Sequence, residues 1–191
     1  MNKDEQNRLL NVCNNNHVPT DELVIRVLIY GGLRASELAH MQLKWINYQQ
    51  MQIEMPRTQP CDCEDCKKHD NLWISKTEAA ERSIPLFLIN EETWFALGKY
   101  FTLFTEMKIK RKAIWKRVVD CAERAKIPHK VFPHALRSTC AMNLAYMGLG
   151  EMDICRILGW QDLNSASPYV KKAGVQIRKT LEQMRLEGKR A

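Results

Sequence analysis

The chain of 191 residues is long enough for one domain with a substantial core, and its 45% hydrophobic and 27% charged residues are typical of a soluble globular protein. The formal net charge of +7 favours a polyanionic partner, with nucleic acid ahead of an anionic membrane, and simple solubility is an equal interpretation. No run of about 18 apolar residues is present, so no membrane-spanning helix is predicted. Seven cysteines without an export signal predict a reducing, cytoplasmic setting and no disulfide framework.

The N-terminal part of the chain predicts three helices. Residues 3–13 suit a short amphipathic helix. Thr20 is a suitable N-cap for the second helix, whose nearly continuous apolar run predicts burial and which ends at a glycine pair. The third helix begins near Arg34, where free backbone N–H groups and the guanidinium favour an anion. The alternative is a surface arginine paired with Glu37, which lies on the same helix face.

The middle of the chain predicts a small antiparallel sheet. Residues 44–55 alternate between apolar and polar around a central turn, which predicts two short strands. A third strand is predicted at 82–86, where Pro85 indicates a strand end or edge. Lys76 is expected at the hairpin turn or its entry. We therefore predict an α+β fold that is mostly α-helical, with a three-stranded antiparallel sheet on one side.

A cluster of cysteines occupies the insert between the predicted strands. Cys63 and Cys66 have the spacing of a zinc knuckle, and Cys61 and His69 complete a set of four ligands. Four ligands within nine residues are cramped, and no second Cys-x2-Cys pair follows. The alternative to a structural zinc site is a solvated turn with reduced thiols.

Two further helices are predicted at 90–104, capped by Asn90, and at 108–126. The second one has an apolar face that includes Trp115 and a basic opposite face. A solvated surface and contact with a DNA backbone explain that basic face equally well. Its residues are Lys108, Lys110, Arg111, Lys112, Lys116 and Arg117.

The C-terminal third predicts a helix that starts near Pro133 and carries His134 and Arg137 on one face. A short helix, residues 152–158, precedes Trp160, and Tyr169 follows nine residues later, just after Pro168. A basic tail helix completes the chain. Taken singly, each of these polar or aromatic side chains has an ordinary structural interpretation.

Taken together, these pieces resemble the catalytic domain of the tyrosine recombinases, the phage-type integrases. The matching motifs share their order along the chain and their spacing with that family. They are Gly32-Leu33-Arg34-Ala35-Ser36-Glu37-Leu38, Lys76 ahead of Arg82-Ser83-Ile84-Pro85-Leu86, His134-Ala135-Leu136-Arg137, Leu158-Gly159-Trp160, and Tyr169.

The resemblance implies a DNA integrase of a mobile element, whose reaction needs no metal, cofactor or ATP. Tyr169 would attack a phosphate and form a 3′-phosphotyrosine ester, with His134 as the nearest base. Arg34 and Arg137 would bind the phosphate oxygens. Two further residues complete the implied site: Lys76 would protonate the leaving 5′ oxygen, and Trp160 would pack against the phosphate and donate its N–H.

The resemblance also carries expectations about the whole molecule. The catalytic domain would span residues 1–191, without the N-terminal DNA-clamping domain that most relatives carry. The partner would be double-stranded DNA at a specific recombination site, bound by a homotetramer joined through the tail helix, 173–191. The cysteine insert resembles inserts in some archaeal integrases. Two alternatives remain: a non-catalytic DNA-binding or regulatory remnant, and a related enzyme that relaxes supercoils or resolves hairpin ends.

Overall fold

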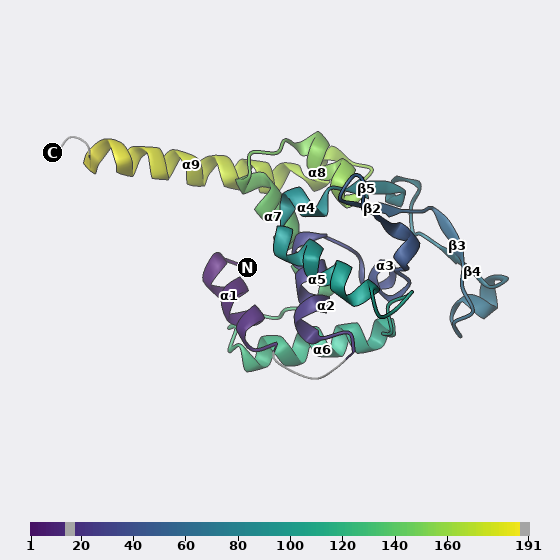
Figure 1. Cartoon of the computed structure of the whole chain (residues 1–191). Coiled ribbons are helices and arrows are strands. Elements are labelled where there is room, and N and C mark those ends of the chain that lie inside the picture. Colours follow the sequence, from purple (N-terminus) through teal and green to yellow (C-terminus); the bar gives the residue numbers. More distant parts are fainter. Residues whose placement is uncertain (14–17, 188–191) are drawn as a thin grey trace.

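A computed structural model of the chain describes residues 1–13 and 18–187. Its centre is helix α2 (Asp21–Tyr30), in which eight of the ten residues are buried. Helices α5, α6 and α7 pack around α2, as Figure 1 shows. Thr20 caps α2 by accepting a hydrogen bond from the backbone N–H of Leu23, as the sequence predicts. Each fully buried leucine or isoleucine of this helix contributes roughly 1.5–3 kcal/mol, so α2 anchors the core.

The remaining helices surround this centre and include a short one, α4, that the sequence analysis did not predict. Asn90 caps α5 with its side chain, as predicted. The α-helices are α1 (Lys3–Asn11), α3 (Ala35–Ala39), α4 (Leu86–Ile89), α5 (Glu91–Phe101), α6 (Arg111–Arg124), α7 (Pro133–Tyr146), α8 (Glu151–Leu158) and α9 (Ser167–Glu187). Four short 3-10 helices are also present in the described residues: η1 (Leu43–Trp45), η2 (Cys66–His69), η3 (Glu78–Ala80) and η4 (Leu163–Ser165).

The predicted three-stranded antiparallel sheet is present on one side of the helices. Its strands are β1 (Ile46–Asn47), β2 (Gln52–Met55) and β5 (Arg82–Ile84), in the order β1-β2-β5. Met55 lies opposite Arg82, and both side chains are buried. The fold class is thus confirmed as α+β and mostly helical.

A second hairpin, which no sequence pattern predicted, lies between β2 and β5. Strands β3 (Thr58–Pro60) and β4 (Leu72–Ile74) pair antiparallel and project from the body, as Figure 1 shows. Each strand has only three residues, and Pro60 indicated the end of a strand, so the alternation was too short to detect. Lys76 follows β4 and lies between this hairpin and β5.

The last helix begins earlier than predicted. Helix α9 starts at Ser167, with Pro168 in its first turn, where the missing N–H of proline leaves no helical hydrogen bond unmade. Tyr169 therefore belongs to the same helix as the tail, whose C-terminal half extends away from the body in Figure 1. Residues 188–191 of the predicted tail lie outside the described residues. Within 1–13 and 18–187, no helix is long and apolar enough to cross a membrane.

Candidate active site

One buried carboxylate, that of Glu37, organises the candidate site. Its side chain is 1% exposed and lies in the first turn of α3. Its two oxygens accept hydrogen bonds from the backbone N–H and the guanidinium of Arg34, at 2.7 and 2.6 Å. The predicted pairing of Arg34 with Glu37 is therefore present, and the same carboxylate also caps the first turn of α3.

Two further arginines reach the same carboxylate from distant parts of the chain. Arg82, on β5, donates to both oxygens of Glu37, with Nη2 at 3.0 Å and Nη1 at 3.3 Å. Arg137, on α7, places Nη1 3.7 Å from Oε2 of Glu37. Glu37 thus gathers three guanidiniums, and the excess of positive charge favours an anion such as a phosphate.

The carboxylate is strongly stabilised in its charged form. Burial alone would raise the pKa of Glu37, but the charge and hydrogen bonds of Arg82, together with the charges of Arg137 and Arg34, lower it to about 2. Burial lowers the pKa of Arg137, and Glu37 opposes that effect. A guanidinium remains protonated at neutral pH, so this cluster stays ionised.

Two glycines with left-handed backbones supply carbonyl oxygens to the arginines. Gly32 (φ 59°) accepts from Arg137, whose other terminal nitrogen donates to the carbonyl oxygen of Leu158. Gly159 (φ 61°) accepts from Nη2 of Arg34 at 3.2 Å. A Cβ on Gly32 would lie 2.3 Å from Cδ2 of Leu158, and one on Gly159 would lie 2.5 Å from the carbonyl oxygen of Ala79. Both positions therefore require glycine.

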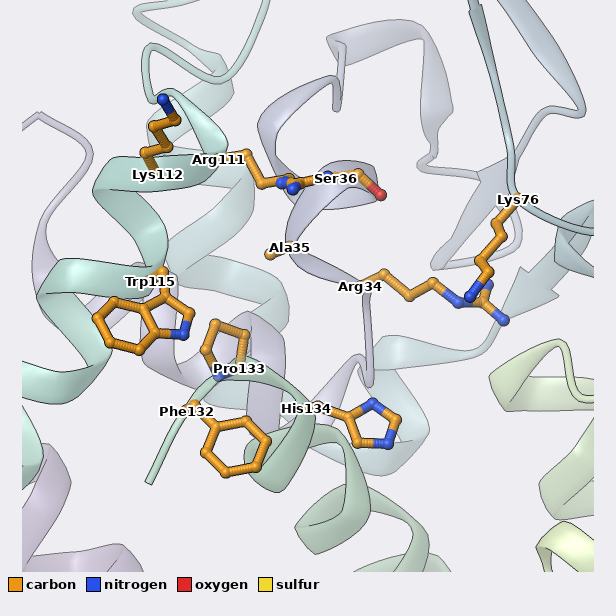
Figure 2. A pocket seen from close by; sticks show the side chains of 10 residues that line it. All are labelled: Arg34, Ala35, Ser36, Lys76, Arg111, Lys112, Trp115, Phe132, Pro133 and His134. Carbon is orange, nitrogen blue, oxygen red and sulfur yellow. The ribbon is translucent and has the colours of Figure 1, made fainter. Parts of the chain in front are cut away.

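Arg34, Lys76 and His134 line one open pocket of about 450 Å³. Figure 2 shows Arg34 at the start of α3, Lys76 after β4 and His134 at the start of α7. Arg34 is 21% exposed, which makes its guanidinium accessible from the pocket. Three of the predicted site residues, from three separate segments, therefore meet here.

The rest of the pocket lining comes mainly from α6 and from the residues just before His134. The prediction of a basic face on α6 is correct for Arg111 and Lys112, which line the pocket. Trp115 was predicted on the buried face, and that prediction is wrong: its side chain is 56% exposed and also lines the pocket. Arg117 was predicted on the basic face, but it donates to the carbonyl oxygen of Pro19 at 2.7 Å. An exposed indole beside basic residues suits contact with a nucleic acid.

The environment of His134 favours its neutral form. Partial burial and the charges of Arg137, Arg34 and Lys76 lower the pKa of His134 below its ordinary value of 6.5. The imidazole is therefore neutral at pH 7 and can accept a proton.

Arg137, Trp160 and Tyr169 form a stack beside this pocket. The guanidinium carbon of Arg137 lies 5.8 Å from the ring centroid of Trp160, within the range of a cation–π contact. The ring of Tyr169 stacks on Trp160, with the centroids 5.8 Å apart and an interplanar angle of 27°. The Arg137 side chain is only 1% exposed. The six predicted residues therefore form two neighbouring groups that Glu37 joins through Arg34 and Arg137.

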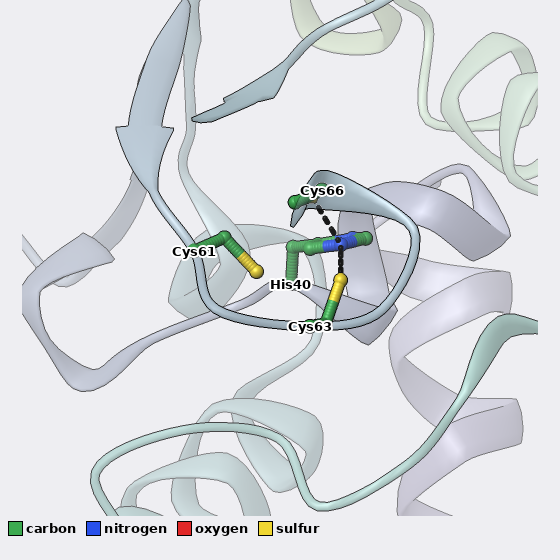
Figure 3. Close-up of side chains that lie close together, drawn as sticks. All are labelled: His40, Cys61, Cys63 and Cys66. Carbon is green, nitrogen blue, oxygen red and sulfur yellow. Dashed lines mark hydrogen bonds between the residues drawn. The ribbon is translucent and has the colours of Figure 1, made fainter. Parts of the chain in front are cut away.

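The cysteine cluster differs from the prediction in one ligand. Side-chain ligand atoms of Cys61, Cys63, Cys66 and His40 all lie within 4.8 Å of one another. Figure 3 shows the four side chains close together. His69 was predicted as the fourth member, but it ends the 3-10 turn η2 and is not part of this group. Because His40 lies more than 20 positions before the cysteines, sequence spacing gave no indication of it.

Comparison with known proteins identifies the family. The model of the phage integrase family matches residues 1–174, which is most of the chain. The chain therefore belongs to the phage integrase family.

Individual relatives agree with this assignment. Tyrosine recombinase XerD of Staphylococcus saprophyticus is 33% identical over 81 residues, which are 41% of this chain and 28% of XerD. The fold resembles that of XerA recombinase, with a TM-score of 0.69, 21% identity, and coverage of 97% of this chain and 62% of XerA. It also resembles the Tn1549 transposon integrase in complex with transposon right end DNA, with a TM-score of 0.65, 17% identity, and coverage of 94% and 65%. The chain thus spans less than two thirds of each of these relatives.

Proposed function

We propose that the chain is the catalytic part of a site-specific DNA recombinase that cuts and rejoins strands through a covalent phosphotyrosine. The observation that carries this proposal is the convergence of Arg34, Arg137 and Tyr169 around Glu37 and Trp160. Membership of the phage integrase family and the DNA in the Tn1549 complex support it.

Each side chain has one chemical task in this proposal. Arg34 and Arg137 bind the non-bridging oxygens of the phosphate and offset the charge that develops there. His134, neutral at pH 7, accepts the proton of the Tyr169 hydroxyl. Tyr169 attacks phosphorus and the 5′ oxygen leaves, protonated by Lys76. The ester conserves the bond energy, so a 5′ hydroxyl can displace Tyr169 and reseal the strand without ATP or a catalytic metal ion.

Binding of the phosphate by Arg137 requires a rearrangement of the stack. In the structure, Arg137 is 1% exposed and lies against Trp160, on which Tyr169 is stacked. We therefore expect DNA to separate Tyr169 from Trp160, which directs the phenol at the phosphate, and to shift Trp160 off Arg137, which uncovers the guanidinium. Trp160 then packs against the phosphate and donates its indole N–H.

Covalent capture tests this function. A pool of nicked duplexes carries random sequence beside the nick, so the target sequence need not be known. The nick traps the covalent adduct, because cleavage there releases a short fragment that diffuses away and cannot be rejoined. We expect wild-type protein, without Mg²⁺ or ATP, to form a DNA adduct that survives SDS and disappears on protease treatment. Tyr169→Phe should form none, whereas Tyr146→Phe, which alters an exposed tyrosine outside the site, should retain it. Salt-dependent DNA binding without any adduct would instead indicate a non-catalytic remnant.

Replacement of His134 by alanine should lower the rate of adduct formation by about 10²–10⁴-fold, the usual contribution of a positioned general base. Because the pKa of His134 is lowered, the wild-type rate should fall only when the pH drops below about 6.5. His134→Ala should lack this acid limb. His129→Ala, which alters an exposed histidine near Glu5, is the matched control. Wild-type rate in His134→Ala would contradict the assignment of the base.

The proposal extends to assembly and setting. Recombination joins two duplexes and so requires four active sites, for which we propose a homotetramer on DNA. Helix α9 projects beyond the body and is the proposed linking element. We also propose a reducing, cytoplasmic setting, in which none of the seven cysteines is paired in a disulfide.

A further inference from the structure

We propose that His40, Cys61, Cys63 and Cys66 bind one Zn²⁺ ion, which fastens the hairpin preceding Lys76 to helix α3, whose N-cap is Arg34. The metal site itself does not depend on the proposed recombinase function. Only its effect on DNA cleavage does.

The distances between the ligand atoms fit a tetrahedral zinc site. Nε2 of His40 lies 3.4 Å from Sγ of Cys63 and 3.4 Å from Sγ of Cys66. With Zn–S near 2.3 Å and Zn–N near 2.0–2.1 Å, a tetrahedron places nitrogen and sulfur about 3.5 Å apart. The sulfur of Cys61 points into the same space, as Figure 3 shows. Three thiolates and one imidazole are a ligand set that selects zinc over the harder divalent cations.

The outer contacts of His40 orient its ring for metal binding. Nδ1 lies 2.7 Å from the carbonyl oxygen of Ser36, to which it can donate, and this tautomer leaves the lone pair of Nε2 directed at the sulfurs. The indole of Trp73 stacks on the imidazole, with the centroids 5.6 Å apart and an interplanar angle of 23°. Histidine ligands in zinc sites characteristically have such a backbone acceptor behind them.

The hairpin already contacts His40 through its strands. Gln59 of β3 donates to the carbonyl oxygen of His40 at 2.6 Å and accepts from the indole N–H of Trp45 at 2.7 Å. Trp73 of β4 lies opposite Gln59. A zinc ion would add a bond from His40 to the loop between these two strands. The hairpin would then be held to His40 both by the hydrogen bond of Gln59 and by the metal.

Two segments connect the proposed metal site to the candidate active site: helix α3 and the segment that follows β4. Helix α3 has Arg34 as its N-cap and His40 as its C-cap, so the two side chains are separated by five helical residues. On the other side, Lys76 lies two residues beyond the end of β4, the second strand of the hairpin. Arg57 holds this segment by donating to the carbonyl oxygens of Ser75 and Thr77, at 2.5 and 3.1 Å. Zinc would therefore fix the position of Lys76 relative to Arg34.

Metal analysis of the full chain, purified under reducing conditions and dialysed against metal-free buffer, tests the site. We expect about one zinc ion per wild-type chain by mass spectrometry. His40→Ala and Cys63→Ser should each lower the zinc content by about 10-fold or more at the same protein concentration. His69→Ala is the matched control and should keep the full content. Replacement by Co²⁺ should give the visible bands of a tetrahedral site and sulfur-to-metal charge transfer.

A second readout reports on the hairpin independently of DNA. Trypsin can cut after the exposed Lys67 and Lys68, which follow Cys66 directly in the loop between β3 and β4. We expect zinc to slow this cleavage by about 10-fold or more relative to metal-free protein and to His40→Ala, because bound metal suppresses local opening. Folding of each variant is checked by its circular dichroism spectrum.

Four results would overturn the metal site: wild-type protein without zinc, iron in place of zinc, a disulfide between the clustered cysteines, or His40→Ala with the wild-type zinc content. If wild-type protein forms the DNA adduct, His40→Ala should form it more slowly and His69→Ala at the normal rate. If no adduct forms at all, the recombinase proposal fails, and the metal content still decides the zinc site.

Discussion

Replacement of Glu37 by glutamine should lower the free energy of unfolding by about 3–5 kcal/mol, the usual effect of removing one partner from a buried ion pair. Glutamine has nearly the same shape, so the loss is one of charge. Without the carboxylate, the guanidiniums of Arg34, Arg82 and Arg137 would remain close together with no compensating charge. Urea titration followed by circular dichroism measures this change.

The contribution of Glu37 should also depend on pH in one direction. Its pKa is about 2 in the folded protein and near 4.5 in the unfolded chain, so the unfolded state binds a proton first as the pH falls. The stabilisation, about 3 kcal/mol, should be complete above pH about 4.5 and should disappear as the pH falls toward about 2. In Glu37→Gln, this part of the pH dependence should be absent.

An exposed carboxylate provides the control for Glu37. Glu106 forms an ion pair with Lys108 in which both side chains are about half exposed. Glu106→Gln should change the free energy of unfolding by less than about 0.5 kcal/mol. If Glu37→Gln were as mild as Glu106→Gln, the carboxylate would not be the centre of the site.

Replacement of Arg137 by lysine should reduce the rate of DNA adduct formation by about 10²-fold or more, because it removes a preorganised donor to the phosphate. Lysine keeps the positive charge, but its single ammonium group lacks the planar fork of a guanidinium. It therefore cannot donate to the carbonyl oxygens of Gly32 and Leu158 and bind an anion through two parallel hydrogen bonds at the same time. The measurement is single-turnover cleavage of the captured duplex at saturating protein.

For Arg137→Lys, a lower cleavage rate caused by unfolding must be distinguished from one caused by weaker binding of the phosphate. Arg34→Lys alters the more exposed guanidinium, which costs less stability, and should slow cleavage in the same direction. Arg26→Lys, which alters an arginine paired with Glu22 and Glu92 outside the site, should cleave normally. A folded Arg137→Lys protein with normal cleavage would show that this guanidinium does not bind the phosphate.

The sequence was sufficient for the parts of the fold that depend on local signals. Thr20 and Asn90 cap their helices as predicted, and residues 46–55 form the predicted strand pair. The hairpin of β3 and β4 was missed because three-residue strands leave no detectable alternation. Trp115 was assigned to the wrong face because a large aromatic residue usually indicates the core.

The site depended on contacts between distant parts of the chain. The six proposed residues could be named because they lie in motifs with fixed spacing, but their arrangement around Glu37 could not be predicted. Arg82 lies in a matched motif, but no role was predicted for it. Its place on the same strand face as the buried Ile84 is the signal of a buried acidic partner. His40 had no local signal, since it is brought to the cysteines only by the docking of the hairpin on α3.

The identity of the residue that carries the DNA tests the central claim most directly. Wild-type adduct would be digested with nuclease and trypsin, and the peptide bearing the residual nucleotide would be sequenced by mass spectrometry. We predict that the nucleotide is linked through phosphate to the phenolic oxygen of Tyr169 and to no other residue. Attachment to a different tyrosine, or to a serine or cysteine, would contradict the proposed site.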